Sequence, residues 1–421
     1  MSTLKKKKKN VVRDVSQTPQ HSSCDNDSKK SYRQEPPSWS NIPAIALRKI
    51  YQSLDDEDRA SMARVNKSWY EGYRDPALWR VRIIAFNEQR EEEDIDAGSS
   101  KSEAERPLAN ECAISFASSL APYLQELEIH INQSLRSSTD VIGDFMEFAH
   151  LLDVANLTKV HILFYDDDMF EGQRSENFIK VINRLIRNQH NLKRFDIDLA
   201  FFEPEHGIKL LKCLAEASGR TLETLFLNNV FVDTVDIYRE YRIVTELKKF
   251  TNLHEIHIDY ALVADELIQL WSRECPTLEY IKLWAIPQNN IIRNDSWKTL
   301  VKTHPELLVE LHAYDHLDTE ITPAILTSAM PVYDLTWDTL FGFTSEVELT
   351  NFFRRVASYH KTIERIFLMF GVEFEIPETF SVHNILSNCS NLLPYKFENR
   401  IPNSRVWMLS QDPRRLTQDI I

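Results

Sequence analysis

The sequence lacks the motifs of several common catalytic sites. Its 421 residues include only eight glycines, and none of them belongs to a glycine-rich phosphate-binding loop. There is no Cys-x-x-Cys pair and no His-Glu-x-x-His motif, so neither a structural zinc site nor a zinc protease is indicated. We therefore predict no catalytic residues, no metal site and no cofactor, and a protein that is not an enzyme.

Cysteines are few and long hydrophobic runs are missing. The five cysteines are far apart and odd in number, which argues for reduced thiols rather than a disulfide framework. No apolar run reaches the roughly 18 residues that a membrane helix needs. The basic start MSTLKKKKKN is not followed by an apolar segment, unlike a secretory signal. These features predict a cytoplasmic or nuclear protein, or one found in both places, with no membrane partner.

Charge is unevenly distributed along the chain. Residues 1–37 hold nine basic and four acidic side chains, a net charge of +5, so the rest carries −14 − 5 = −19. We expect 1–37 to be a disordered basic tail and 87–107 an acidic flexible insert. The lysines Lys5 to Lys9 fit a nuclear-import signal, a weak polyanion contact or a simple solvated tail equally well. The acidic body makes nucleic acid an unlikely partner, because phosphate contacts dominate that affinity.

Between these two polar segments, residues 42–82 show apolar side chains at helical spacing. Pro43 suits the first turn of a helix, and Leu47, Ile50, Tyr51 and Leu54 follow at intervals of three and four. An acidic turn comes next, in which Asp55 is placed to cap a second helix. So short a helical unit cannot bury all its apolar groups internally. The segment is therefore predicted to bind a partner.

This segment resembles the F-box, whose pattern combines Leu-Pro, an apolar helix, an acidic turn, Val-Cys-x-x-Trp and a final Leu-Trp. Ile45, Arg59 and Asn66 depart from that pattern. The resemblance implies three helices over residues 38–86 that bind a Skp-type adaptor and, through it, cullin and RING subunits. The implied adaptor-binding residues are Pro43, Leu47, Ile50, Tyr51, Leu54, Val65, Trp69, Leu78 and Trp79.

From residue 108 onward a short apolar phrase of the type Leu-x-x-Leu-x-Leu recurs. It appears ten times, starting at residues 124, 157, 192, 222, 253, 278, 308, 332, 363 and 392. The phrase alternates apolar and polar residues like a half-buried strand, and helical patterns follow it. A period near 30 residues is typical of a solenoid. We predict one solenoid over residues 108–421; a non-solenoid α/β domain is the alternative.

The repeats resemble a divergent leucine-rich repeat array. That resemblance implies an α/β solenoid with a parallel sheet inside and helices outside, after the small three-helix F-box. The order of F-box pattern, acidic insert and degenerate repeats also resembles the metazoan group of F-box only proteins 39 and 33.

The strand register predicts which side chains face the concave side. The third and fifth residues of each six-residue phrase point there, and so does the seventh residue counted from its start, because side chains alternate along a strand. Aromatic residues at such positions are typical of binding hot spots; the alternative is that a loop, a helix or the C-terminal tail covers them. The predicted substrate-binding residues are Phe226, His257, Tyr280, Lys282, Trp284, His312, Tyr314 and Phe367.

Three functions remain open at this stage. The first, which we predict, is the substrate-recognition subunit of a Skp–cullin–F-box ubiquitin ligase. The second is a repeat scaffold or inhibitor that binds one protein partner without any ligase. The third is a nuclear adaptor whose basic tail meets nucleic acid or acidic proteins.

Overall fold

The structure is a computed structural model of the whole chain. It describes residues 39, 42–86, 110–132, 139–165, 176–231, 241–285, 292–315, 325–339, 345–370, 382–392 and 405–410. The predicted basic tail (1–37) and acidic insert (87–107) lie outside these residues. Among the helices of the described part, none is both long and apolar enough to cross a membrane.

Three short helices come first: α1 (Ala44–Gln52), α2 (Asp56–Ala63) and α3 (Lys67–Tyr73). Polar side chains start the second and third, as expected of residues that satisfy free helical N–H groups. The Asp55 carboxylate accepts from the backbone N–H of Asp58 at 2.7 Å. The Asn66 side chain accepts from the backbone N–H of Trp69 at 3.0 Å. We call residues 42–80 the helical module; the cap predicted at Asp55 is confirmed.

In the described residues, a single sheet of eleven strands follows, and its spatial order is the order along the chain. Strands β1 to β10 are parallel, and β11 is antiparallel to β10. The strands are β1 (Val81–Phe86), β2 (Glu126–Asn132), β3 (Lys159–Tyr165), β4 (Arg194–Asp198), β5 (Thr224–Asn228), β6 (Glu255–Asp259), β7 (Tyr280–Ala285), β8 (Leu308–Asp315), β9 (Val332–Thr339), β10 (Arg365–Phe370) and β11 (Arg405–Ser410).

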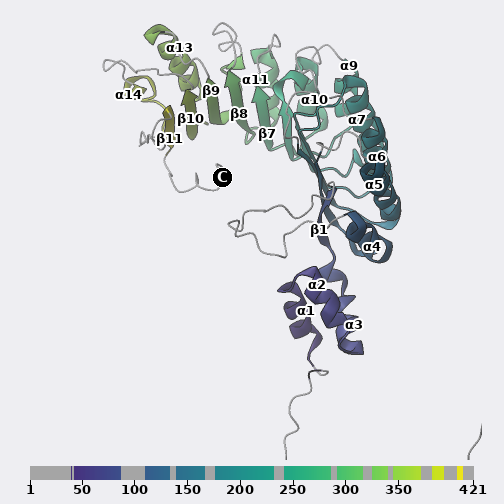
Figure 1. Cartoon of the computed structure of the whole chain (residues 1–421). Coiled ribbons are helices and arrows are strands. Elements are labelled where there is room, and N and C mark those ends of the chain that lie inside the picture. Colours follow the sequence, from purple (N-terminus) through teal and green to yellow (C-terminus); the bar gives the residue numbers. More distant parts are fainter. Residues whose placement is uncertain are drawn as a thin grey trace, which may run out of the picture.

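Helices cover the outer side of this curved sheet (Figure 1). The helices between parallel strands are α4 (Asn110–Leu120), α5 (Thr139–Leu151), α6 (Glu176–Arg187), α7 (Pro204–Ser218), α9 (Tyr241–Leu247), α10 (Asp265–Glu274), α11 (Asn294–Thr303) and α13 (Glu346–Val356). The short helix α14 (Val382–Ile385) lies between the antiparallel strands β10 and β11. A parallel sheet lined by helices on its convex side is the predicted solenoid, and the fold prediction is confirmed.

Each of the nine phrases that begin at residues 124 to 363 contains a strand, and the sheet also includes a strand that the phrases did not predict. Strand β1 has the sequence VRIIAF, within the segment that sequence analysis placed with the F-box. It pairs with β2, so the sheet begins directly after the helical module. Of the tenth phrase only Leu392 lies in the described part, where it is in a turn. The last strand of the described part is β11, which pairs antiparallel with β10.

The alternation within the phrases determines the core. In β5, Leu225 and Leu227 are buried, whereas Thr224, Phe226 and Asn228 on the other face are partly exposed. On the convex side of the sheet, where the buried strand side chains point, helix α6 contributes five buried apolar residues. One continuous core results, and it runs from Leu47 in α1 to Leu392. The helical module therefore packs on the first repeat, at the β1 end of the sheet (Figure 1).

Candidate protein-binding surfaces

The nine residues that the F-box resemblance implies fall into two groups. Leu47, Tyr51, Leu78 and Trp79 are buried within the chain. The others, Pro43, Ile50, Leu54, Val65 and Trp69, are partly or largely exposed. The first group can act only by shaping the module in this conformation, while the second can reach a partner.

The buried group is held by hydrogen bonds as well as by apolar contact. The Tyr51 hydroxyl donates to the Trp69 carbonyl at 2.8 Å, and the Trp79 indole N–H donates to the Tyr73 carbonyl at 2.6 Å. The rings of Tyr73 and Trp79 meet edge to face with centroids 4.8 Å apart. Helices α1 and α3 also approach closely, since a Cβ on Gly72 would lie 2.5 Å from Leu47 Cδ2.

The positions that depart from the F-box pattern have local roles. Arg59 is buried; its Nε donates to the Tyr51 carbonyl at 2.7 Å, and its guanidinium pairs with Asp56 at 2.8 Å. Asn66 caps α3. Arg59 therefore ties α2 to the end of α1, a function that an apolar residue at this position could not perform.

Three large apolar residues of the helical module are at least half exposed. The exposed fraction is 74% for Ile45, 60% for Val65 and 50% for Tyr70. In the sequence, Ile45 stands out only as a departure from the F-box pattern, and nothing distinguishes Tyr70. Helical spacing alone could not separate them from the buried stripe, because the packing of α1 against α3 decides which side is covered.

The second surface is the concave face of the sheet, which we define as the third, fifth and seventh residues of the phrases in β2 to β10. Of the eight predicted substrate-binding residues, Phe226, His257, Tyr280, Lys282, Trp284, His312 and Phe367 lie there and are partly exposed. The side chain of Tyr314 lies outside the described part. Parallel pairing brings these residues together in rows: Phe226 aligns with His257, His257 with Lys282, and Trp284 with His312.

At β4 to β6 the concave face carries a stack of cationic and aromatic groups. The His257 ring lies 3.6 Å from the Phe226 ring at an interplanar angle of 15°. The Arg194 guanidinium lies 4.4 Å from the centroid of the same phenyl ring. His257 Nε2 is 2.8 Å from Glu255 Oε1, two residues earlier on the strand. The Phe226 ring on β5 is thus held in place by Arg194 on β4 and His257 on β6.

At β7 to β9 a buried carboxylate, Glu310, organises the face. Its oxygens contact Lys282 Nζ at 2.7 Å and His312 Nε2 at 2.5 Å. The hydroxyl of Tyr280 donates to it, and that of Tyr333 lies at 3.3 Å. Burial works to raise the pKa of Glu310, but the hydrogen bonds from His312 and Lys282 and the charge of Lys282 outweigh it and hold that pKa well below its usual range. Glu310 is therefore a fixed negative charge.

Tyr333 was missed by sequence reasoning, because it reaches the concave face through a bulge. Val309 pairs with Val332 but Glu310 pairs with Asp334, so β9 has one extra residue between these pairs. A bulge re-aims a side chain without changing the hydrophobic pattern around it. It brings the Tyr333 ring to 6.1 Å from that of Tyr280.

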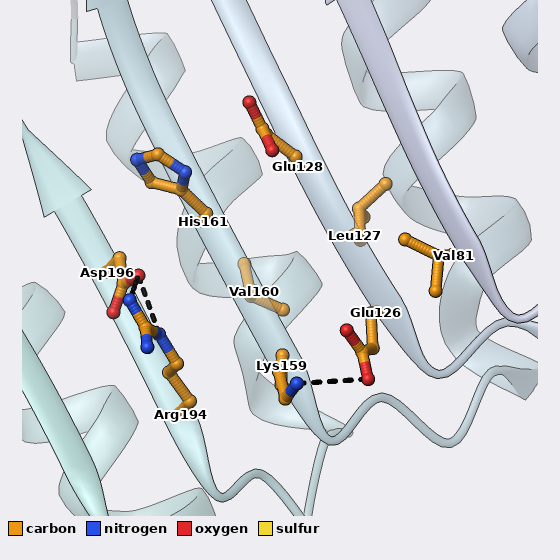
Figure 2. Close-up of a pocket in the computed structure, with 9 residues that line it drawn as sticks. All are labelled: Val81, Glu126, Leu127, Glu128, Lys159, Val160, His161, Arg194 and Asp196. Atoms are coloured by element: carbon orange, nitrogen blue, oxygen red, sulfur yellow. Dashed lines mark hydrogen bonds and ion pairs between the residues drawn. The ribbon is translucent and has the colours of Figure 1, made fainter. Parts of the chain in front are cut away.

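At the β1 end of the sheet the concave face is hollowed. The hollow has a volume of about 190 Å³. Figure 2 shows that Lys159 pairs with Glu126 and Arg194 with Asp196, while the carboxylate of Glu128 stands apart from both pairs. The hollow is lined by Val81, Glu126, Leu127, Glu128, Lys159, Val160, His161, Arg194 and Asp196.

The described cysteines are not placed for covalent chemistry. Burial raises the pKa of the Cys275 thiol to about 11, and it also raises the pKa values of Cys213 and Cys389. A reactive cysteine needs the opposite shift. Within the described ranges, no group of three or more His, Cys, Asp or Glu side chains is arranged to hold a metal ion.

Comparison with known proteins gives a weak sequence likeness. No family model matches the chain. The chain is 20% identical over 284 residues to a Bos taurus protein, F-box/LRR-repeat protein 21. The match covers 66% of this chain and 60% of that relative, so the chain spans less than two thirds of the relative's length.

Two solved structures are also similar. One is the leucine-rich repeat-containing protein LegL7 of Legionella pneumophila, with 11% identity and a TM-score of 0.30 over 67% of this chain and 77% of that one. The other is a Bacteroides fragilis protein with 11% identity and a TM-score of 0.24 over 47% of this chain and 69% of that one. At these scores the architecture rests on the strand pairing described above, not on either neighbour.

Proposed function

We propose that this protein is the substrate-recognition subunit of a Skp–cullin–F-box ubiquitin ligase. In this proposal the helical module binds the Skp-type adaptor, which recruits the cullin and RING subunits, and the concave face holds a protein substrate. The protein then acts by proximity, because it raises the effective concentration of a substrate lysine near the ligase machinery. The likeness to an F-box/LRR-repeat protein supports this proposal.

The observation that carries the proposal is the combination within the helical module of a fixed interior and exposed apolar residues. Leu47, Tyr51 and Trp79 give the module a packed interior, while Ile45 and Val65 leave apolar surface in contact with solvent. Burying that surface against a partner is favourable by about 25 cal/mol per Å² of apolar area.

Co-purification of the full chain with a Skp-type adaptor tests the proposal. The variant Ile45→Glu with Val65→Glu places two charges in the proposed interface and should abolish the complex without disturbing the interior. The matched control is Val154→Glu with Val347→Glu, two residues of similar exposure (65% and 67%) in the solenoid. This control should bind like the unchanged chain.

Either of two results would overturn the proposal. One is that the unchanged, folded chain forms no complex with the adaptor. The other is that both double variants bind equally well. The repeat array would then be better described as a scaffold that binds one protein partner without a ligase.

A further inference from the structure

We infer that the concave face recognises a basic protein segment, one rich in lysine or arginine. This inference rests on the proposed function, in which the bound segment belongs to a protein substrate that is ubiquitinated. It starts from the charges on the concave face of β2 to β10, all of which belong to described side chains. These positions hold nine carboxylates and four lysines or arginines, an excess of 9 − 4 = 5 negative charges when the histidines are neutral.

The cations of the face are already matched within the chain. Each of the four forms an ion pair with a concave carboxylate: Lys159 with Glu126, Arg194 with Asp196, Lys282 with Glu310, and Arg365 with Asp334. Lys282 and Arg365 are also largely buried. The face therefore has little free positive charge with which to attract an acidic or phosphorylated segment.

Several of the remaining carboxylates can still meet a cation from outside. The side chains of Glu128 and Glu255 are 35% and 34% exposed, and the polar contact of each is to a histidine two residues later. Asp259 is fully buried, and burial raises its pKa to about 7. Burial also raises the pKa of Asp334 to about 6 and the pKa values of Asp196 and Asp198, so the negative excess of the face near neutral pH is smaller than five. Opposite charge in a concave, low-dielectric setting attracts a ligand more strongly than the same charge on a flat surface.

Aromatic groups lie beside this charge and suit the same ligand. Phe226, Tyr280, Trp284 and Tyr333 are partly exposed and follow one another from β5 to β9. Lysine and arginine side chains carry long apolar stems that pack on such rings while the charged head stays near a carboxylate. A basic segment would therefore use both the carboxylates and the aromatic rings, whereas a simple metal ion would use only the carboxylates.

Fluorescence anisotropy with the full chain tests the inference. The probe is a labelled peptide of alternating lysine and alanine, and the comparison peptides have glutamine or glutamate in place of lysine. We expect only the lysine peptide to bind, with an affinity that falls steeply between about 50 and about 300 mM NaCl.

Charge-neutral variants then locate the site. Glu128→Gln with Glu255→Gln keeps the size and acceptor oxygen of each side chain and should weaken binding roughly fivefold or more. The control, Glu176→Gln with Glu216→Gln, makes the same change in net charge on the outer helices α6 and α7, where these side chains are 61% and 63% exposed. It should change the affinity less than about twofold.

Two outcomes would overturn the inference. The first is equal binding of the lysine and glutamine peptides, and the second is an equal loss in the concave and convex variants. Binding of the peptide only after Lys5 to Lys9 are changed to glutamine would instead support it, with the chain's own basic run as the occupant. None of these results bears on the adaptor complex, because neither Glu128 nor Glu255 belongs to the helical module.

Discussion

The guanidinium of Arg82 on β1 lies 3.1 Å from the carboxylate of Asp56 on α2. The same guanidinium packs over the Trp79 ring, 4.5 Å from its centroid, and Asp56 also pairs with Arg59. This arrangement joins the helical module to the first strand of the sheet through a largely buried charge. This contact fixes the position of the helical module relative to the first strand, as the proposed function requires of its two binding surfaces.

We predict that Arg82→Ala destabilises the contact between the helical module and strand β1. Breaking a fully buried ion pair costs roughly 3–5 kcal/mol, but Asp56 is 33% exposed and keeps Arg59, so we expect a loss of about 2 kcal/mol. Urea unfolding measures this loss, and faster proteolysis between the module and the sheet should accompany it. The control is Arg48→Ala, which removes an exposed pair with Asp75 and should cost at most about 1 kcal/mol. Equal losses in the two variants would contradict the role of Arg82.

A pair of glycines tests the packing of the outer helices. A Cβ on Gly207 of α7 would lie 2.2 Å from the buried ring of Phe231, whereas a Cβ on Gly143 of α5 would meet nothing within 4 Å. Gly207→Ala should therefore lower the stability by about 1–3 kcal/mol through overpacking. Gly143→Ala should raise it by roughly 0.5–1 kcal/mol, because alanine is the better helix former. Thermal denaturation distinguishes the two, and a shift in the same direction for both would refute the packing argument.

Asp259 should make the stability depend on pH near neutrality. Burial raises the pKa of this carboxyl from 3.8 to about 7 in the folded chain. The stability that it contributes is therefore complete below about pH 4 and is lost as the pH rises through 7. Asp259→Asn removes the ionisation, so the melting temperature of the variant minus that of the unchanged chain should increase from pH 5 to pH 8.

The control for this prediction has the opposite sign. Burial works to raise the pKa of Asp265, but hydrogen bonds from Ser296 and Arg293 prevail and lower it. The stability from Asp265 is thus present at neutral pH and lost in acid, so Asp265→Asn should destabilise the chain most near pH 7. A difference for Asp259→Asn that does not change with pH would show that this carboxyl does not titrate in the folded state.

The strand register was predictable because it depends on a short alternating pattern. Leu225 and Leu227 are buried and Phe226 faces the concave side, as the phrase at residue 222 indicates. Strand β1 was missed as part of the sheet because VRIIAF lacks the leucine spacing of the other phrases. Tyr333 was missed because a single extra residue leaves the repeat period almost unchanged.

The sequence by itself determined the repeating architecture: each phrase and each following helix has an apolar face that only a neighbouring repeat can bury. Only the tertiary structure decided how individual side chains are used. It buries Leu47 and Tyr51 inside the helical module and leaves Ile45 and Val65 in solvent. It also gathers Lys282, Glu310 and Tyr333 from three strands into one charged cluster. The physical reason is that burial and ion pairing depend on neighbours far away along the chain, and a local pattern contains no information about them.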